Sequence, residues 1–283
     1  MAEYEVLYNS LSGNGRGKER AKEAEKLLNS NNTELLDVTK IENKKAWFEG
    51  ITPGTKVVLV GGDGTLSRFA DSLRDTKIEN EIYLYPSGTG DDFKADVAKD
   101  ETGLIKINDY LNNLPLVTVN GKTYSFINGV GYGIDGYCCE VGDEKRAKSD
   151  KPVNYAGIAI KGLLFHFKPV NARVTVDGKE YTFKKVWLAP TMKGRHYGGG
   201  MIPTPAQDRF DPEGRVSLML FHGSGKLKTL MIFPSIFKGG HISHKDCVTV
   251  MKGKNIEVEF DRPTALQIDG ETIKNVKKYS VCA

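Results

Sequence analysis

Three apolar segments in the N-terminal part of the chain are each followed at once by a glycine-rich turn. Residues 4–8 precede NSLSGNGRG, residues 56–60 precede GGDGT, and residues 82–85 precede PSGTGDDF. Short apolar runs that end in glycine and polar turn residues are typical of buried strands in a parallel sheet. Because turns after successive parallel strands gather at the carboxyl edge of a sheet, we expect these three turns to form one polar site.

The turn after residues 56–60 indicates a phosphate site. Its glycines, Gly61, Gly62 and Gly64, allow backbone N–H groups to approach a polyphosphate without interference from a Cβ atom. Asp63 then lies at the phosphates. A carboxylate is unfavourable there unless a divalent cation separates the charges or the carboxylate takes a proton from an attacking hydroxyl. This favours magnesium-dependent phosphoryl transfer, and the plain alternative is a sharp strand-to-helix turn.

The sequence changes character near residue 115. Before it, strands alternate with helical stretches at 17–29, 66–74 and 102–112, as in a parallel sheet covered by helices. After it, the dipeptides Asn120-Gly121 and Asp177-Gly178 predict two hairpins, and strands at 247–251 and 256–260 around Lys252-Gly253-Lys254 predict a third. We therefore predict an α/β domain with a parallel sheet over residues 1–115 and a mainly antiparallel domain over residues 116–283.

One helical segment interrupts the predicted hairpins. Residues 155–167 carry several apolar side chains and few charges. A core helix is the plain interpretation, and a helix in contact with lipid is the alternative.

Charge and targeting signals exclude some classes of partner. The formal net charge of +4 is too small to argue for nucleic acid, although it suits contact with an anionic membrane surface. No apolar run approaches the roughly 20 residues that span a bilayer, and the N-terminus lacks the features of a signal peptide. Four cysteines without C-x-x-C spacing suit a reducing compartment. We expect a cytoplasmic chain that is peripheral on the inner face of the membrane.

A series of motifs resembles those of the diacylglycerol kinase catalytic family, which includes sphingosine and ceramide kinases. In chain order they are N-x-x-S-G at 9–13, GGDGTL at 61–66, P-x-GTG-x-DF at 86–93, F-x-NG-x-G-x-G-x-D at 126–135, GGGM at 198–201, G-x-H at 239–241 and IDGE at 268–271. GGDGT alone is shared with NAD kinases, whereas its combination with the later motifs is specific. The resemblance implies an N-terminal domain like those of NAD kinase and phosphofructokinase, followed by a β-sandwich.

The resemblance also implies site residues and cofactors. Glu271 matches the residue that takes the proton from the lipid hydroxyl, and Asp63 is its rival for that role. The cofactors implied are ATP and Mg²⁺. The residues matched to the nucleotide site are Asn9, Ser12, Gly13, Thr39, Gly61, Gly62, Asp63, Gly64, Thr65, Ser67, Gly88 and Thr89.

A structural magnesium is implied less directly. The family has a compact Asp-Asp-Gly where this chain has Asp211-Pro212-Glu213-Gly214. The expected ligands are therefore Asp211 and Glu213, with backbone carbonyls near Phe210 and Arg215. A surface loop without an ion is the alternative.

Three departures from the family pattern bear on activity. Asp91 replaces an asparagine, Asn14 replaces a lysine, and residues 115–118 lack a frequent aspartate. The expected function is ATP-dependent phosphorylation of a lipid hydroxyl, most simply diacylglycerol to phosphatidic acid. An NAD kinase-like enzyme and a non-catalytic nucleotide- or lipid-binding homologue are the alternatives. Expected partners are the lipid substrate at a membrane surface, no nucleic acid, and, as an open alternative, a second copy of the chain.

Overall fold

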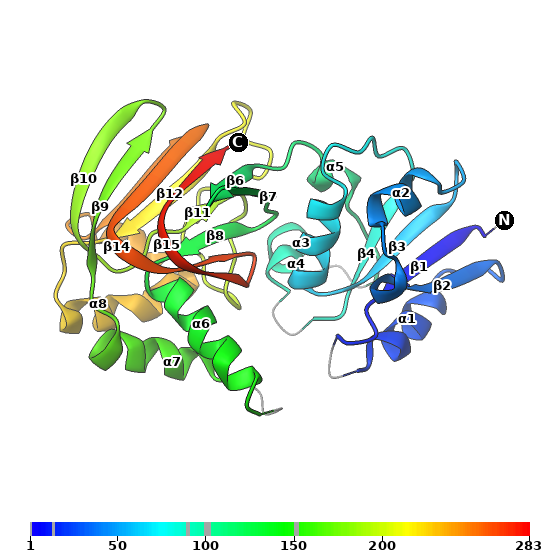
Figure 1. Cartoon of the computed structure of the whole chain (residues 1–283), viewed down its shortest axis with the longest axis horizontal. Coiled ribbons are helices and arrows are strands. Elements are labelled where there is room, and N and C mark those ends of the chain that lie inside the picture. The colour runs from blue at the N-terminus through cyan, green and yellow to red at the C-terminus, as the bar shows by residue number, and fades with distance from the viewer. Residues whose placement is uncertain (1, 13–14, 89–90, 99–102, 150–152) are drawn as a thin grey trace. The chain divides into compact units, whose positions relative to one another are not determined.

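The chain divides into two compact units. The computed structural model describes residues 2–12, 15–88, 91–98, 103–149 and 153–283. Unit 1 covers Met1–Leu114 and unit 2 covers Pro115–Ala283 (Figure 1). Each unit has its own sheet and its own hydrophobic core.

Unit 1 is a sheet whose strand order is β2-β1-β3-β4-β5. The pairs β1–β2, β1–β3 and β3–β4 are parallel, which confirms the strands predicted from the three apolar runs. The short strand β5 is antiparallel to β4, so the sheet is mixed at that edge. The strands are β1 (Tyr4–Tyr8), β2 (Thr33–Asp37), β3 (Lys56–Gly61), β4 (Ile82–Pro86) and β5 (Ile105–Lys106).

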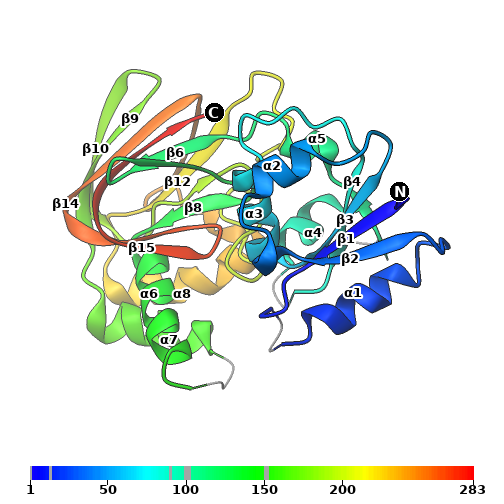
Figure 2. The ribbon, with the colours of Figure 1, turned by 45° about the vertical axis from the view of Figure 1, so that its right-hand side comes forward.

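Helices cover both faces of this sheet. Helix α1 packs Ala21 and Ala24 against Val6 and Val58, while Phe48 of α2 meets Phe69 of α3 edge to face on the opposite face (Figure 2). The remaining helices are short. The bounds are α1 (Gly17–Glu25), η1 (Val38–Lys40), α2 (Lys44–Glu49), α3 (Asp63–Ser72), α4 (Asp92–Val97) and α5 (Asn108–Leu111).

The predicted helix at 102–112 is wrong over most of its length. Ile105 and Lys106 extend the sheet instead, and the Ile107 N–H donates to the Ile82 carbonyl at 2.9 Å. Asn108 then accepts a hydrogen bond from the Ile82 N–H at 2.8 Å. Because these contacts hold the chain along β4, the helix is limited to the four residues of α5.

Unit 2 is a ten-stranded antiparallel assembly. Its main strand order is β13-β12-β11-β8-β14-β15-β6-β7, and β9 pairs with both β10 and β14. Inward-facing side chains of these strands form one core that includes Val174, Leu218 and Val258. The strands are β6 (Leu116–Val119), β7 (Lys122–Ser125), β8 (Gly129–Tyr132), β9 (Val170–Val176), β10 (Lys179–Val186), β11 (Thr191–Met192), β12 (Val216–Phe221), β13 (Val248–Gly253), β14 (Asn255–Ile268) and β15 (Glu271–Cys282).

Two of the three predicted hairpins are confirmed, and the third is wrong. Strands β6–β7 and β9–β10 pair across Asn120-Gly121 and Asp177-Gly178. Strand β13 pairs with β12, and β14 pairs with β15, β8 and β9. The chain is redirected after Gly253 because the Asp177 carboxylate accepts the N–H groups of Lys254 and Asn255 at 2.9 and 2.8 Å. These bonds start β14 along β9 instead of along β13.

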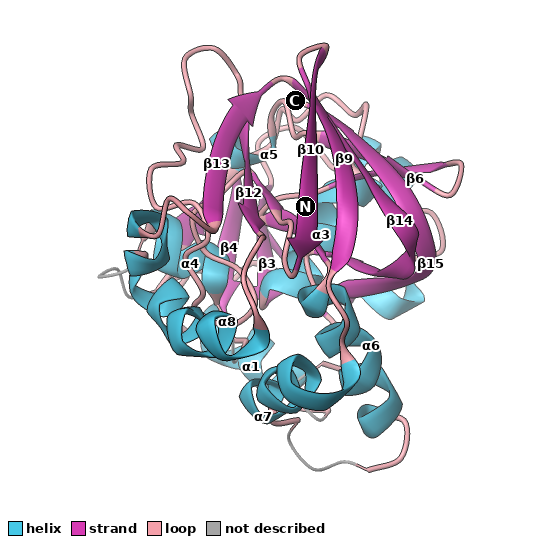
Figure 3. Ribbon diagram, turned by 90° about the vertical axis from the view of Figure 1, so that its left-hand side faces the viewer, coloured by secondary structure: helices cyan, strands magenta, loops and turns pink. Residues whose placement is uncertain are grey.

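The helices of unit 2 gather on one side of its strands, where α6, α7 and α8 lie together (Figure 3). They enclose a second core around Trp187, Leu163 and Ile232. The predicted helix at 155–167 is confirmed as α7 followed by a π-helical turn. The bounds are α6 (Ile134–Arg146), α7 (Tyr155–Lys161), η2 (Gly162–His166), α8 (Lys226–Ile232), η3 (Phe233–Lys238) and η4 (Gly240–Ser243). In the described part of the chain, no helix has the length and apolar content that crossing a bilayer requires.

Candidate functional site

The polar site of unit 1 lies at the carboxyl ends of its parallel strands. The loop after β3 and the loop after β4 are adjacent because these strands pair in register, with Gly61 opposite Pro86. The Ser87 N–H also donates to the Gly61 carbonyl at 3.1 Å. Helix α3 begins directly at this edge, so its positive N-terminal end faces the site. An anion with several oxygens matches such a site.

Asp63 joins two of the glycine-rich turns. Its Oδ2 accepts the Asp92 N–H at 2.8 Å, and its Oδ1 accepts the Phe93 N–H at 2.9 Å. Asp63 therefore caps the N-terminus of α4 from the first turn of α3. Both carboxylate oxygens are fixed by backbone donors. Its assignment to catalysis stays a prediction, and the geometry adds a positioning role.

The glycines of the first turn have different steric surroundings. A Cβ on Gly62 would lie 2.8 Å from the Cα of Gly88, and a Cβ on Gly61 would lie 2.5 Å from the Cβ of Thr65. Gly62 therefore allows the backbone at Gly88 to approach closely, and Gly61 makes room for the Thr65 side chain. A Cβ on Gly64 would meet no atom of the described residues within 4 Å. The open side of the turn, where a phosphate has room, is thus at Gly64.

We expect Gly64→Val to weaken ATP binding by about tenfold or more while the fold is kept, because the new side chain enters the open space. Gly62→Ala is the matched comparison. It should destabilise unit 1 by about 1–3 kcal/mol, because its Cβ meets the Gly88 backbone. Calorimetric titration with ATP and thermal unfolding of both variants separate the two effects. Unchanged ATP affinity in Gly64→Val would exclude the phosphate from this side of the turn.

Asp91 is a strained and poorly solvated acid in the same region. Its backbone is left-handed at φ 37°, and its Oδ1 is buried with no hydrogen-bond partner among the described residues. Burial raises the pKa of Asp91, and the nearby Asp63 charge adds to this, while the Gly88 backbone and Lys94 act in the opposite direction. The folded state therefore binds the Asp91 proton more tightly than the unfolded chain does.

A second prediction follows for Asp91→Asn, which keeps the residue's tolerance of left-handed backbone. Since the folded pKa of Asp91 is raised, its contribution to stability falls as the pH rises from the ordinary value of 3.8 through the folded pKa. The asparagine variant should be more stable at pH 7, by up to about 1 kcal/mol, and should lose this advantage near pH 4. Urea unfolding across this range measures the effect. A gain of the same size at both ends would refute the electrostatic explanation.

The loops after β1 and β2 are joined by an acid that the sequence analysis missed. Asp37 Oδ1 accepts hydrogen bonds from the Thr39 hydroxyl at 2.9 Å and the Ser10 N–H at 3.3 Å. Burial raises the pKa of Asp37, but the hydrogen bonds from Ser10 and Thr39 outweigh it and hold that pKa below its usual value. The pattern Asp-x-Thr at a strand end was the available signal.

Asn9 and Ser12 are mainly occupied with their own loop. The Ser12 hydroxyl donates to the Asn9 carbonyl at 2.8 Å, and Asn9 Oδ1 accepts the Leu11 N–H at 2.8 Å. Ser67 is buried within α3, at 7% exposure. The predicted nucleotide contacts at Gly13 and Thr89, and the departure at Asn14, fall outside the described residues.

The polar site of unit 2 is organised by the turn between β14 and β15. Asp269 Oδ1 accepts the N–H groups of Asn128 and Gly129, both at 2.9 Å, and Oδ2 accepts the Ile127 N–H at 2.7 Å. This carboxylate fixes the segment 127–129 against the hairpin. Glu271, the candidate base, follows two residues later with an exposed side chain. The motifs at 126–135 and 268–271 thus form one local structure.

Two further polar groups complete this structure. Gln267 donates to Asp135 Oδ2 at 2.8 Å and accepts the Gly270 N–H at 2.6 Å, so it connects the last residue of the first motif with the turn. The buried Arg209 donates to the Ile127 carbonyl at 2.5 Å and to Asn128 Oδ1 at 2.6 Å. Hydrogen bonds to a charged donor in a buried place fix geometry strongly.

Lys193 and Arg209 form a cationic pair that the sequence analysis missed. The Lys193 N–H donates to the Asn128 carbonyl at 2.9 Å. Burial lowers the pKa of Lys193, the Arg209 charge lowers it further, and Asp211 and Asp208 oppose both. No short-range pattern marks these residues, because the groups that accept their hydrogen bonds, Asn128 and Ile127, lie more than 60 positions away along the chain.

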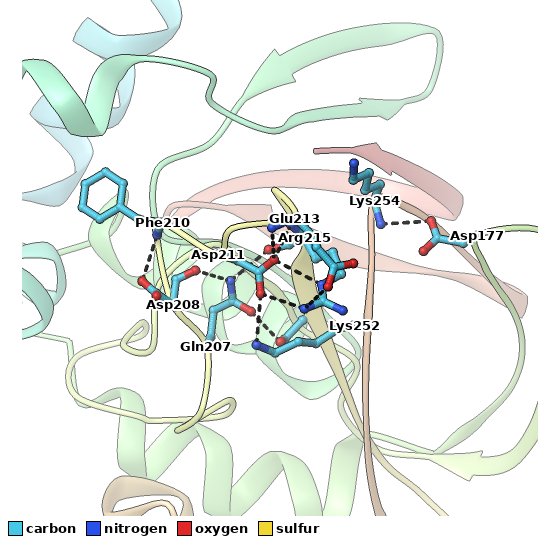
Figure 4. A network of polar contacts seen from close by, with 10 residues as sticks. Asp177, Gln207, Asp208, Phe210, Asp211, Glu213, Arg215, Lys252 and Lys254 are labelled. Carbon is cyan, nitrogen blue, oxygen red and sulfur yellow. Dashed lines mark hydrogen bonds and ion pairs between the residues drawn. The ribbon is translucent and has the colours of Figure 1, made fainter.

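The residues predicted to hold a structural magnesium form an ion-pair network instead (Figure 4). Asp211 Oδ1 accepts from the Arg215 Nε and the Glu213 N–H, both at 3.1 Å, and Oδ2 lies 3.4 Å from Lys252 Nζ. The Arg215 hydrogen bond is the main reason that the pKa of Asp211 lies far below its usual range. Glu213 is exposed and pairs with Arg215 at 3.2 Å.

This arrangement does not fit a bound cation. An ion at Asp211 would meet the positive charges of Arg215 and Lys252, and the Arg215 carbonyl already accepts from Gln207 Nε2 at 3.1 Å. Among the described residues, no group of three His, Cys, Asp or Glu side chains is placed to hold a metal. The predicted ligands Asp211, Glu213 and Arg215 therefore stabilise the loop through one another.

Fold and site together define a kinase with an α/β unit followed by an antiparallel β unit. A family model of the diacylglycerol kinase catalytic domain matches residues 3–114, and a model of the YegS C-terminal NAD kinase beta sandwich-like domain matches residues 128–281. The chain belongs to the diacylglycerol kinase catalytic family and is a lipid kinase.

Named relatives agree with this assignment. A diacylglycerol kinase of Mycobacterium tuberculosis is 26% identical over 266 residues, which cover 90% of this chain and 84% of the relative. A diacylglycerol kinase of Bacillus subtilis is 21% identical over 76% of this chain and 70% of its own length. A solved diacylglycerol kinase structure from Bacillus anthracis has a TM-score of 0.61 at 17% identity and covers 99% of this chain and 93% of that one. This last similarity concerns the fold.

Proposed function

We propose that the chain transfers the γ-phosphate of ATP to the hydroxyl of diacylglycerol and so forms phosphatidic acid. The observation that supports this most directly is the junction at Asp63, which brings the turns of GGDGT and PSGTGDDF together at the N-termini of α3 and α4. The N-terminus of α3 and the open glycine suit the phosphates of a nucleotide, while Asp63 caps α4 beside them. Membership of a lipid kinase family makes ATP the natural donor.

In unit 1, the backbone of the turns would bind and orient the phosphates. Asp63 lies close enough to Asp91 for its charge to raise the pKa of Asp91, and Asp91 Oδ1 is buried with no partner in the part of the chain that the structure describes. Such a carboxylate pair fits a nucleotide-bound magnesium ion, which proteins hold through one or two carboxylates together with phosphates. The ion, when bound, neutralises charge on the transferred phosphoryl group.

In unit 2, Glu271 would take the proton from the acceptor hydroxyl. Its carboxylate is exposed, yet its backbone position is fixed, because Asp269 holds the turn through three N–H groups. A base on a rigid turn loses little freedom when the substrate binds. The acceptor lies in a bilayer, so the proposal includes peripheral action at the cytoplasmic face of a membrane.

The test uses the purified chain, labelled ATP with magnesium, and mixed micelles that contain either diacylglycerol or a sphingoid base, with NAD in a parallel reaction. Labelled phosphatidic acid as the main product would support the proposal. Preferential labelling of the sphingoid base or of NAD would show that this molecule, and not diacylglycerol, is the acceptor. ATP binding without any labelled product would favour a non-catalytic nucleotide-binding protein.

A further inference from the structure

Two helical segments of unit 2 that lie far apart in sequence form one continuous surface. The segment of α7 and η2 contacts α8, and the Lys226 Nζ at the start of α8 donates to the Leu164 carbonyl of η2 at 2.9 Å. Figure 3 shows α7 and α8 on the same side of the strands. Their inner faces are buried, since Ile158, Leu163 and Ile232 belong to the core around Trp187.

The outer faces of the same helices carry large apolar side chains. Leu227 and Met231 are each 74% exposed and stand four residues apart, on one face of α8. Phe165 is 73% exposed and Ile160 is 47% exposed, five residues apart across the π-helical turn, where five residues complete about one turn. Clustered exposed side chains of this size usually mark a contact surface.

Charge on this surface has one sign. Residues 153–170 and 223–245 contain no Asp or Glu, although 36 acidic residues among 283 would place about five in these 41 positions. The lysines in these two segments are Lys161, Lys168, Lys226, Lys228, Lys238 and Lys245.

Acidic neighbours of the surface are engaged with cations. Asp246 pairs with Lys228, Glu140 of α6 lies 3.3 Å from Lys274, and Asp143 of α6 lies 2.6 Å from Arg146. In the part of the chain that the structure describes, the charge around these apolar side chains is therefore mainly positive.

A cavity of about 550 Å³ opens beside the end of η2. Its lining includes Tyr137, Phe167, Lys168 and Arg262, together with Glu140, whose carboxylate pairs with Lys274. The Arg262 guanidinium donates to the Lys168 carbonyl, which holds the Arg262 side chain at the rim beside Lys168. Aromatic walls and cations suit the phosphate and glycerol of a lipid head group.

We propose that Ile160, Phe165, Leu227 and Met231, with Lys161, Lys168 and Lys226 around them, form a docking surface for an anionic lipid bilayer. The apolar side chains enter the boundary between head groups and acyl chains, and the lysines contact lipid phosphates. A second copy of the chain fits less well, because a symmetric contact through this surface would bring like charges together. This docking surface deepens the proposed function, since the proposed acceptor is a bilayer lipid.

The test is vesicle flotation with the full chain, which requires no catalysis. Vesicles of phosphatidylcholine alone are compared with equimolar phosphatidylcholine and phosphatidylglycerol. The parent should bind the anionic vesicles at least tenfold more tightly. The double variant Phe165→Ser, Leu227→Ser should lose at least tenfold in this affinity. Lys161→Glu with Lys168→Glu should lose binding to anionic vesicles and leave binding to neutral ones unchanged.

The matched control is Leu27→Ser, which alters a leucine that is 50% exposed in unit 1. It should bind like the parent. Equal binding by the double variant, an equal loss in Leu27→Ser, or a parent that floats with neither vesicle would overturn the docking surface. A dimer that dissociates in the double variant, without vesicle binding, would assign the surface to self-association instead. Vesicle binding without lipid phosphorylation would support the docking surface and refute the proposed function. Lipid phosphorylation without vesicle binding would support the proposed function and refute the docking surface.

Discussion

Asp63→Ala is expected to lower turnover by two or more orders of magnitude. The substitution removes the carboxylate that faces the proposed phosphate site and leaves the N–H groups of Asp92 and Phe93 without their acceptors. Loss of such a cap also destabilises a protein by about 1–2 kcal/mol. Turnover, ATP affinity and thermal unfolding should therefore all be measured on the same preparation.

Asp63→Asn separates the two roles of this side chain. An amide has one acceptor oxygen, so it keeps at most one of the two hydrogen bonds and presents an N–H₂ group to the other donor. Asp71→Asn is the control, because Asp71 lies on the same helix and pairs with Arg74 at 3.9 Å. If Asp63→Asn retained near-parent turnover while only its unfolding temperature fell, the catalytic assignment would be wrong and the positioning role would stand.

Glu271→Gln is expected to reduce lipid phosphorylation by roughly 100-fold and to leave ATP affinity nearly unchanged. The change removes basicity and charge from the side chain but keeps its shape. Stability should hardly change, because the turn is fixed by Asp269 and the Glu271 side chain is exposed. The measurements are initial rates with micellar diacylglycerol and calorimetric titration with ATP.

Glu257→Gln is a suitable control for this prediction. Glu257 lies in the same hairpin and pairs with Lys278 at 2.7 Å, so it reports the effect of removing a carboxylate from the β14–β15 hairpin without touching the turn. Phosphorylation at close to the parent rate by folded, ATP-binding Glu271→Gln would transfer the role of base to Asp63. A similar loss in both variants would indicate a general electrostatic effect.

Strands and hairpins that depend on local signals could be predicted from the sequence. The strands β1, β3 and β4 follow from short apolar runs that end in glycine or proline turns, and the hairpin at Asn120-Gly121 follows from its dipeptide. The hairpin predicted around Gly253 was wrong because a turn signal does not determine whether the two strands beside the turn pair with each other. Asp177, more than 70 residues earlier, accepts hydrogen bonds from the backbone after Gly253, and this backbone then pairs with β9.

From the sequence, the turns of unit 1 could be predicted to gather at one sheet edge, but the contacts inside each candidate site could not. Sequence located Asp63 in a glycine turn and Glu271 in an Asp-Gly turn, but it did not show that Asp63 caps α4. Arg209 was missed because it lies in an acidic stretch, and its role depends on contacts with residues more than 80 positions away. Arg215 was expected to offer a carbonyl to a metal, whereas its guanidinium side chain binds Asp211.

Strand β15 has a consequence for the order in which the chain acquires its structure during synthesis. Its last residues pair with β6, with Tyr279 opposite Val119 and Val281 opposite Val117. Unit 1 draws its strand pairings from within its own 114 residues, so it can fold while the ribosome is still making the rest. In unit 2, β6 is synthesised early, and its partner β15 follows only about 160 residues later. Pairings between such distant segments also form slowly. During that wait the β6–β7 hairpin exposes an unpaired edge, and nascent chains stalled before β15 should therefore depend most on chaperones.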